Sequence, residues 1–151
     1  MLNEQISKAA EIKVVYKTKV KASDRPVITC SQNAVEVLRP FYEDYMELKE
    51  AFHVIYLNRA NRVIAVIRIS EGSTTATTVD AKHIMQPAIL LNATGMILCH
   101  NHPSGNLKPS EADNHLTKTM KDICKMFDIQ LLDHVILTPE SFYSYADEAE
   151  I

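Results

Sequence analysis

The chain has 151 residues, of which 46% are hydrophobic and 23% charged, with a formal net charge of −3 at pH 7. This balance is typical of one globular domain and excludes a chain that is mainly disordered. The net charge gives no general reason to expect a nucleic-acid-binding protein. No apolar run approaches the roughly 20 residues needed to cross a bilayer, and the first residues hold no signal-peptide core. We therefore expect a soluble, cytoplasmic protein with no membrane partner.

Glycine and cysteine usage excludes several common sites. Only three glycines occur, and they are widely separated, whereas a dinucleotide-binding fingerprint or a P-loop needs two or three at close, fixed spacing. The three cysteines, Cys30, Cys99 and Cys124, are odd in number and far apart. They fit neither a disulfide framework nor a Cys-x-x-Cys metal site. We interpret them as reduced thiols in the core.

The first third of the chain predicts one strand and two short helical pieces. Apolar and basic residues alternate over Ile12–Val20, which is typical of a half-buried strand. Ser31 is a suitable N-cap for a helix whose apolar residues continue to Leu38. A second helical turn is expected after Pro40, up to about Leu48.

The middle of the chain predicts a hairpin followed by a helix. Two β-branched runs, Phe52–Leu57 and Val63–Ile69, are joined by four polar residues, a pattern typical of a β-hairpin. A polar loop is expected over Ser70–Val79. Asp80 can then cap a helix that runs to about Asn92, with Pro87 removing one backbone donor inside it.

The last third predicts a strand, a long helix and a second hairpin. Gly95 is expected to end the preceding helix before a short buried strand, and a loop is expected over His100–Pro109. Ser110 begins the most regular helix of the chain. Two further strands complete the order, at Leu131–Leu137 and Phe142–Tyr145. The expected fold class is α/β, with a mixed sheet flanked by helices.

The sequence His100-Asn101-His102-Pro103, followed by Ser110 and Asp113, is the stretch most informative about function. Two histidines separated by one residue in extended backbone project to the same side, because side chains alternate along a strand. Both imidazoles can then reach one metal ion, and Asp113, one turn into the next helix, can add a carboxylate oxygen. Three protein ligands leave the fourth tetrahedral position to water, as in a catalytic zinc site.

Each part of this pattern also has a purely structural explanation. Ser110 and Asp113 fit an N-cap residue with an acid three positions later, and acids are common in a first helical turn because of the helix dipole. A His-x-His pair at a strand end also occurs by chance. Both signals together, joined by a turn-forming loop of suitable length, favour a metal site.

The segment His100–Asp113 resembles the JAMM motif of the JAB/MPN-type metalloproteases. It is more similar still to the RadC family of bacterial proteins, whose members carry His-Asn-His-Pro-Ser-Gly followed by Pro-Ser and an Asp. The likeness runs from about Glu50 to Tyr145 and includes the late strand Leu132–Ile136.

The resemblance implies a JAB/MPN, cytidine-deaminase-like architecture for a metal-binding domain over residues 49–147. Residues 1–48 would form a short N-terminal strand and helix, and residues 148–151 a tail. Longer RadC proteins carry an N-terminal region with helix-hairpin-helix character, and we expect this chain to be a short form without it.

The resemblance also implies the residues of the site. The metal ligands of the family fall on His100, His102 and Asp113, and the implied cofactor is Zn²⁺. The serine of the family motif, which hydrogen-bonds the reacting centre, falls on Ser110. The family also needs an upstream glutamate that binds the metal water and acts as general base, and the matching position is Glu50.

Two other glutamates compete with Glu50 for the role of general base. Glu43 and Glu47 lie in a helical stretch, where exposed carboxylates are the ordinary outcome. The implied reaction is hydrolysis of an amide or isopeptide bond in a peptide or protein substrate that the sequence does not identify. Glu50 would take the proton of the zinc-activated water and deliver it to the leaving amine, and Ser110 would stabilise the oxyanion.

Several residues near the motif receive weaker predictions. Asp133 and His134 could hydrogen-bond the metal-binding imidazoles, or could form an ordinary hydrogen-bonded pair at a strand end. Asn101 and Cys99 alternate away from the two ligands, so we expect Asn101 to fix the loop and Cys99 to lie in the core. The remaining histidines are expected to have surface or structural roles: His53, His83 and His115.

Two other functions stay open at this stage. The DNA-repair label of the RadC family suggests a nucleic-acid-associated module, whose affinity for a short duplex should fall steeply with salt. A non-catalytic scaffold is the other, although scaffolds have no need of an open metal site. The amphipathic first strand could also pair with the edge of another chain, which would give a homo-oligomer.

Overall fold

The computed structural model describes residues 9–72 and 79–151, and its centre is a five-stranded sheet with the order β2-β1-β3-β4-β5. β3 and β4 pair in parallel, whereas the other neighbours are antiparallel. The sheet is therefore mixed, as predicted. The strands are β1 (Ala51–Leu57), β2 (Val63–Glu71), β3 (Gly95–Asn101), β4 (Gln130–Leu137) and β5 (Phe142–Ser144).

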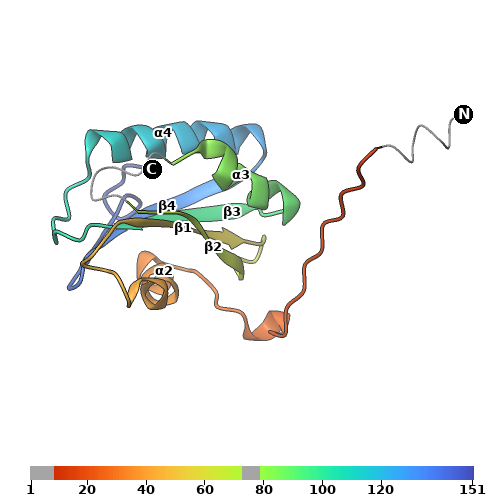
Figure 1. Cartoon of the computed structure of the whole chain (residues 1–151), viewed down its shortest axis with the longest axis horizontal. Coiled ribbons are helices and arrows are strands. Elements are labelled where there is room, and N and C mark those ends of the chain that lie inside the picture. The colour runs from red at the N-terminus through yellow and green to blue at the C-terminus, as the bar shows by residue number, and fades with distance from the viewer. Residues whose placement is uncertain (1–8, 73–78) are drawn as a thin grey trace, which may run out of the picture.

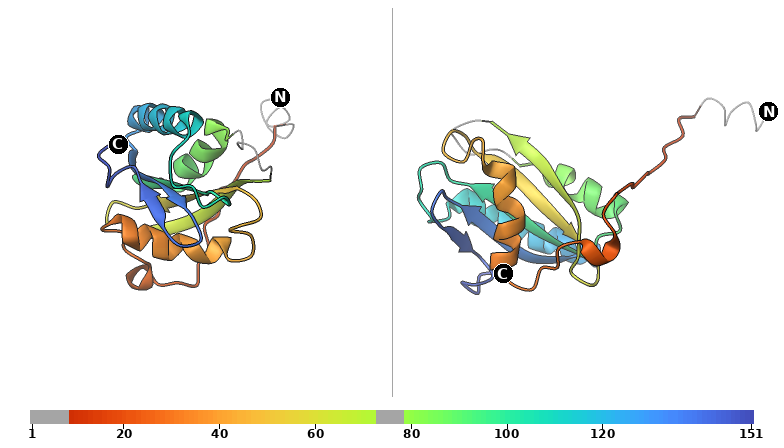
Figure 2. Two further views of the ribbon diagram at one scale, coloured as in Figure 1. Left: turned by 90° about the vertical axis from the view of Figure 1, so that its left-hand side faces the viewer. Right: turned by 90° about the horizontal axis from the view of Figure 1, so that it is seen from below.

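Helices cover both faces of the sheet (Figures 1 and 2). α3 (Ala81–Leu90) and α4 (Glu111–Met126) lie on one face, and α2 (Ser31–Leu38) lies on the other. The parallel pair β3 and β4 is connected through α4, so the end of β3 and the start of α4 lie at the same edge of the sheet. In the described ranges, no helix is long and apolar enough to cross a membrane.

The alternation of side chains along β3 divides the core into two clusters. Met96 and Leu98 belong to the cluster on the side of α3 and α4, whereas Ile97 and Cys99 belong to the cluster on the side of α2. Every residue of β3 is buried. Continued by two residues, this alternation directs His100 toward α4 and Asn101 toward α2.

The pairing of β3 with β4 is interrupted once. Met96 pairs with Leu131 and Ile97 pairs with Asp133, so Leu132 is an extra residue in β4. Leu132 and Asp133 consequently both lie on the α2 side of the sheet, beside Ile97. A bulge of this kind shifts the alternation of every residue that follows it.

Local capping explains where several elements begin. Asp80 accepts a hydrogen bond from the backbone N–H of Lys82 at 2.9 Å and so caps α3, as predicted. In the turn between β1 and β2, Asn58 Oδ1 accepts from the N–H groups of Ala60 and Arg62, each at 3.0 Å. Both predicted hairpins are present.

The predicted strand over Ile12–Val20 is wrong. Among the described residues this segment pairs with no strand, and it extends away from the domain in Figure 1. It contacts the domain through the Tyr16 hydroxyl, which donates to the carbonyl of Ile64 at 2.8 Å. An amphipathic pattern supplies a suitable surface, but a strand also needs a neighbour whose backbone is free to pair.

Two boundaries in the next segment also differ from the prediction. Cys30, not Ser31, occupies the N-cap position of α2, and the Ser31 hydroxyl instead donates to Asp147 at 2.6 Å. After α2 the chain forms the short 3₁₀ helix η2 (Arg39–Tyr42) and then turns as far as Leu48. A further 3₁₀ helix, η1 (Ala22–Asp24), precedes α2.

The β3 strand is longer than predicted at both ends. α3 ends at Leu90, and Gly95 is the first residue of β3 rather than the end of the helix. His100 and Asn101, predicted as loop, belong to β3 because its pairing with β4 continues that far. Most of the predicted loop Ser70–Val79 lies outside the described residues.

The cysteines differ in burial. Cys99 and Cys124 are buried, as predicted, and burial raises the pKa of the Cys99 thiol to about 12. Cys30 is exposed, which contradicts its assignment to the core.

Candidate metal centre

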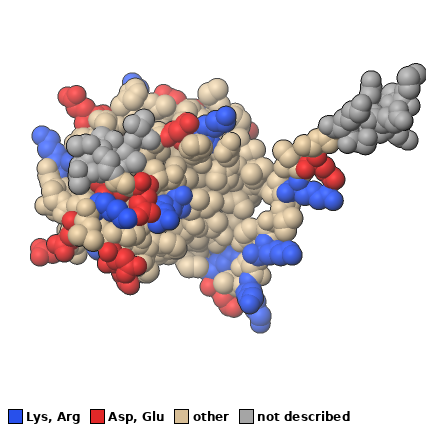
Figure 3. All heavy atoms as spheres, viewed as in Figure 1, with Lys and Arg blue, Asp and Glu red and all other residues tan. Residues whose placement is uncertain are grey.

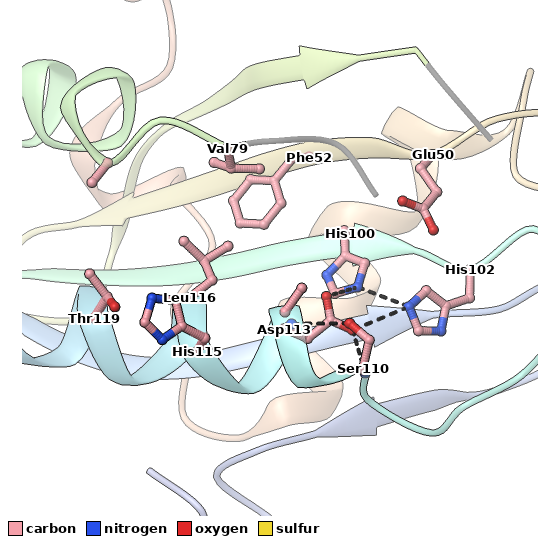
Figure 4. Close-up of a pocket in the computed structure, with 12 residues that line it drawn as sticks. Glu50, Phe52, Val79, His100, His102, Ser110, Asp113, His115, Leu116 and Thr119 are labelled. Atoms are coloured by element: carbon pink, nitrogen blue, oxygen red, sulfur yellow. Dashed lines mark hydrogen bonds and ion pairs between the residues drawn. The ribbon is translucent and has the colours of Figure 1, made fainter. Parts of the chain in front are cut away.

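Three side chains that could hold one metal ion meet where β3 ends and α4 begins (Figure 4). His100 Nε2 lies 3.0 Å from His102 Nε2 and 3.2 Å from Asp113 Oδ1. His102 Nε2 lies 3.6 Å from Asp113 Oδ2. One ligand atom from each of the three residues falls within 4.8 Å of the others. The structure thus brings together the three predicted ligands.

The start of α4 holds Asp113 in place through a capping box. The Ser110 hydroxyl oxygen accepts from the N–H of Asp113 at 3.1 Å, and Asp113 Oδ2 accepts from the N–H of Ser110 at 2.8 Å. The carboxylate of Asp113 therefore caps α4 and at the same time lies beside the two histidines. Oδ2 serves the helix end, and Oδ1 lies nearest to His100.

The protonation of His102 favours metal binding through Nε2. Its Nδ1 lies 2.6 Å from the carbonyl oxygen of Asn106. A carbonyl only accepts hydrogen bonds, so Nδ1 carries the ring hydrogen and Nε2 of the neutral imidazole keeps its lone pair. That lone pair lies on the side of His100 and Asp113.

The site concentrates negative charge. Burial alone would raise the pKa of Asp113, but the neighbouring imidazoles of His100 and His102 and the N–H of Ser110 hold this pKa well below its usual range. The same carboxylate raises the pKa of His102 above its ordinary value, and the charge on Glu50 adds to the rise. Asp113 is therefore ionised, which suits a cation ligand. Two imidazole nitrogens and one carboxylate form a donor set that fits zinc.

A cavity of about 490 Å³ opens over these ligands and is also lined by Glu50 and Ser110. In Figure 4 the Glu50 carboxylate lies on the same side of the cavity as His100 and His102. The competing glutamates, Glu43 and Glu47, are exposed and do not line it. Of the three glutamates considered, the structure brings only Glu50 to the candidate metal centre.

Asn101 holds the segment that carries Glu50. Its Oδ1 accepts from the N–H of Ala51 at 2.8 Å, and its Nδ2 donates to the carbonyls of Met46 and Lys49 at 2.8 and 2.9 Å. Asn101 is fully buried on the α2 side of the sheet. Asn101 points away from the ligands, as predicted, but the segment that it fixes is the one that leads into β1 rather than its own loop.

Asp133 and His134, both predicted to hydrogen-bond the ligating imidazoles, lie on opposite sides of the sheet. His134 Nε2 lies 2.9 Å from His100 Nδ1, so His134 supports a ligand directly. Asp133 faces the other side of the sheet, where it accepts from the Ser144 hydroxyl at 2.6 Å and from the Ala146 N–H at 3.0 Å. Burial raises the pKa of Asp133, and its contacts support β5 rather than the ligands.

His115 is exposed, as predicted, and together with Thr119 it also lines the cavity. A helical-spacing argument could have found this wall. Ala112, Leu116 and Thr119 lie at the spacing i, i+4 and i+7 on α4, which defines one face of the helix. The remaining wall includes Phe52, Val79 and Ala81, which give the cavity an apolar side.

Comparisons with known proteins agree with the fold. The family model described as "RadC-like JAB domain" matches residues 28–150. The chain is 40% identical over 121 residues to a UPF0758 protein of Flavobacterium johnsoniae, covering 80% of this chain and 52% of the relative. It is 40% identical over 123 residues to a UPF0758 protein of Coprothermobacter proteolyticus, with the same coverages.

A third relative aligns with nearly the whole chain. A UPF0758 protein of a Janthinobacterium species is 32% identical over 148 residues, covering 96% of this chain and 66% of the relative. The chain thus spans about half to two thirds of the length of the curated relatives it matches. With the His-x-His, serine and aspartate of the motif grouped at one edge of a mixed sheet, the chain belongs to the RadC-like JAB domain family.

Proposed function

We propose that this domain is a zinc-dependent hydrolase that cleaves an amide or isopeptide bond in a peptide or protein substrate. One observation carries the proposal: the Nε2 atoms of His100 and His102 and the Asp113 carboxylate converge in a cavity that a second carboxylate, Glu50, also lines. A purely structural helix cap would need neither the two imidazoles nor the second acid.

In this proposal His100, His102 and Asp113 hold zinc. A bound zinc ion would supply a Lewis acid that polarises the scissile carbonyl and lowers the pKa of a water molecule toward ~7. Glu50 accepts the proton of the attacking water and delivers it to the leaving amine.

Ser110 is suited to stabilise the oxyanion that develops in the transition state. Its oxygen accepts the capping hydrogen bond from Asp113, so the hydrogen of its hydroxyl stays free to donate. A hydroxyl donor aimed at the developing negative charge contributes most in a site that excludes water. The apolar wall formed by Phe52 and Leu116 supports such exclusion.

The test combines zinc content with peptide cleavage. We expect about one zinc per chain by elemental analysis of protein purified without chelator or nickel, and cleavage of a member of a panel of peptides and lysine-isopeptides. Glu50→Gln should keep the zinc and lose cleavage, and His102→Ala should lose both. Glu47→Gln, a change at an exposed glutamate of the same segment, is the matched control.

Two results would contradict the proposal. One is protein that binds no zinc even after zinc is added. The other is a Glu50→Gln variant that cleaves as fast as the unmodified protein.

A further inference from the structure

The proposed function gives no role to the buried His134. His134 is completely buried, and neither of its ring nitrogens has a carboxylate as hydrogen-bond partner. In a neutral imidazole one ring nitrogen donates a hydrogen bond and the other accepts one. Both nitrogens have partners: Nδ1 lies 2.6 Å from the Thr117 hydroxyl and Nε2 lies 2.9 Å from His100 Nδ1.

The contact between Thr117 and the Asp113 carbonyl determines the direction of each hydrogen bond in this series. The Thr117 hydroxyl lies 2.7 Å from the backbone carbonyl of Asp113. A carbonyl only accepts, so Thr117 donates there and its oxygen is left to accept from His134 Nδ1–H. His134 Nε2 then accepts from His100 Nδ1–H. His100 Nε2 is thereby left with its lone pair, facing Asp113 and His102.

We propose that Thr117 and His134 are positioning residues that fix the tautomer of His100 and so present its Nε2 to a metal ion. The proposal rests on the zinc-binding part of the proposed function. In the opposite arrangement Thr117 would donate to His134, and the Asp113 carbonyl would lose this donor. His134 would then donate to His100, which would carry its hydrogen on Nε2, directed at the metal position.

The surroundings hold the hydrogen-bond relay formed by Thr117, His134 and His100 rigid. Thr117 is 3% exposed, so water does not compete for its hydroxyl. The ring of His134 stacks on Tyr145, with centroids 5.1 Å apart and planes at 9°, and the ring of His100 stacks on Phe52 at 6.0 Å and 7°. The relay joins the backbone of one ligand, Asp113, to the ring of another, His100.

Isosteric pairs of variants test the hydrogen bonds apart from the packing. Thr117→Val keeps the shape but removes the acceptor for His134 Nδ1–H, whereas Thr117→Ser keeps the hydroxyl. His134→Phe keeps the ring stack but removes the acceptor for His100, whereas a Gln at the same position, His134→Gln, can offer its carbonyl oxygen. Thermal unfolding of all four variants identifies any that fail to fold.

The first measurement is zinc affinity by competition with a chromophoric chelator. Losing a hydrogen-bond partner of a metal ligand typically lowers metal affinity about 10–100-fold. We expect losses of this size for Thr117→Val and His134→Phe, near-native affinity for Thr117→Ser, and partial rescue by His134→Gln relative to His134→Phe. Equal affinity of the valine and serine variants would overturn the proposal.

The second measurement is the tautomer itself, from ¹⁵N NMR spectra of the imidazole rings with and without zinc. We expect a hydrogen on Nδ1 of both His134 and His100, and its loss from His134 Nδ1 in Thr117→Val. A role in packing alone would not move that hydrogen. An unmodified protein whose His100 lacks a hydrogen on Nδ1 would overturn the proposal. If the expected tautomers appear but zinc does not bind, the proposed function fails and the assignment of the relay stands.

Discussion

The side-chain oxygen of Asn101 accepts a hydrogen bond from the backbone N–H of Ala51 at 2.8 Å. This bond ties the residue after Glu50 to the residue after His100. Two neighbouring positions of one strand thus face opposite sides of the sheet and serve the same site. His100 offers a ligand on one side, and Asn101 fixes the approach of the proposed general base from the other.

Replacing Asn101 with alanine should destabilise the protein and release the segment before β1. The change leaves the buried Ala51 N–H and the part-buried carbonyls of Met46 and Lys49 without their partner. We expect the free energy of unfolding in urea to fall by about 2–4 kcal/mol, since an unsatisfied buried group costs about 1–3 kcal/mol and the two part-buried carbonyls, which water can reach, cost less. Gln32→Ala, at an exposed amide on α2, should change it little. An equal effect of the two substitutions would contradict this role of Asn101.

Two different substitutions of Ser110 should distinguish its role in helix capping from its proposed role in catalysis. Ser110→Ala removes the cap and should cost about 1 kcal/mol of unfolding free energy, whereas Ser110→Gly should cost only a few tenths. Both lose the hydroxyl donor, so both should lower kcat about 10²–10³-fold while zinc stays bound. If kcat follows stability instead, with glycine near native, the hydroxyl has no part in the reaction.

Zinc should stabilise the folded protein against heat. A ligand that binds the native state at 100 times its Kd adds about 2.7 kcal/mol to the free energy of unfolding. We expect excess zinc to raise Tm and excess chelator to reverse the rise. His102→Ala should abolish the shift, and His115→Ala should retain it, because His115 lines the cavity without belonging to the ligand group. A shift that survives His102→Ala would place the zinc elsewhere.

His53 should make the metal-free protein less stable as the pH falls. Burial, with the nearby charge of Arg68, lowers the pKa of His53 to about 4, and its Nδ1 has no hydrogen-bond partner. Below pH about 6.5 the His53 side chain is protonated in the unfolded chain but stays neutral in the folded protein. The unfolding free energy should therefore decrease between pH 6.5 and 4, by up to about 1.4 kcal/mol per pH unit from this group.

The measurement is the pH dependence of urea unfolding for His53→Phe beside the unmodified protein. The phenylalanine should flatten the acid-side slope, since one proton fewer is taken up on unfolding. His83→Gln, a change at an exposed histidine of α3, should leave the slope unchanged. Parallel curves for the His53 variant and the unmodified protein would contradict the prediction.

The metal ligands could be predicted because their geometry is local. His100 and His102 obey the alternation of a strand, and Asp113 follows from a capping pattern within a few residues. Glu50 lies some 50 positions upstream, and no spacing rule connects it to the histidines, so only the family resemblance identified it. His134 was one of two adjacent candidates, and the sequence alone does not reveal which of them faces His100.

The errors have a common physical origin. Alternation over Ile12–Val20 reports an amphipathic segment, but whether a strand forms depends on a free edge elsewhere in the fold. Gly95 resembled a helix end because the sequence does not show that β4 extends the pairing of β3 in that direction.

The bulge at Leu132 in β4 places His134, rather than Asp133, behind His100. If Leu132 paired with Ile97 in a regular strand, the alternation from Leu131 would turn Asp133 toward α4, and a carboxylate would stand where the imidazole of His134 does. Carboxylate partners increase the electron donation of a ligating imidazole. A neutral imidazole in that place adds no charge, so a zinc ion held by two neutral histidines and Asp113 would keep a formal excess of one positive charge. Once zinc is bound, the bulge would thus favour a more electron-poor metal ion with a stronger attraction for a carbonyl oxygen.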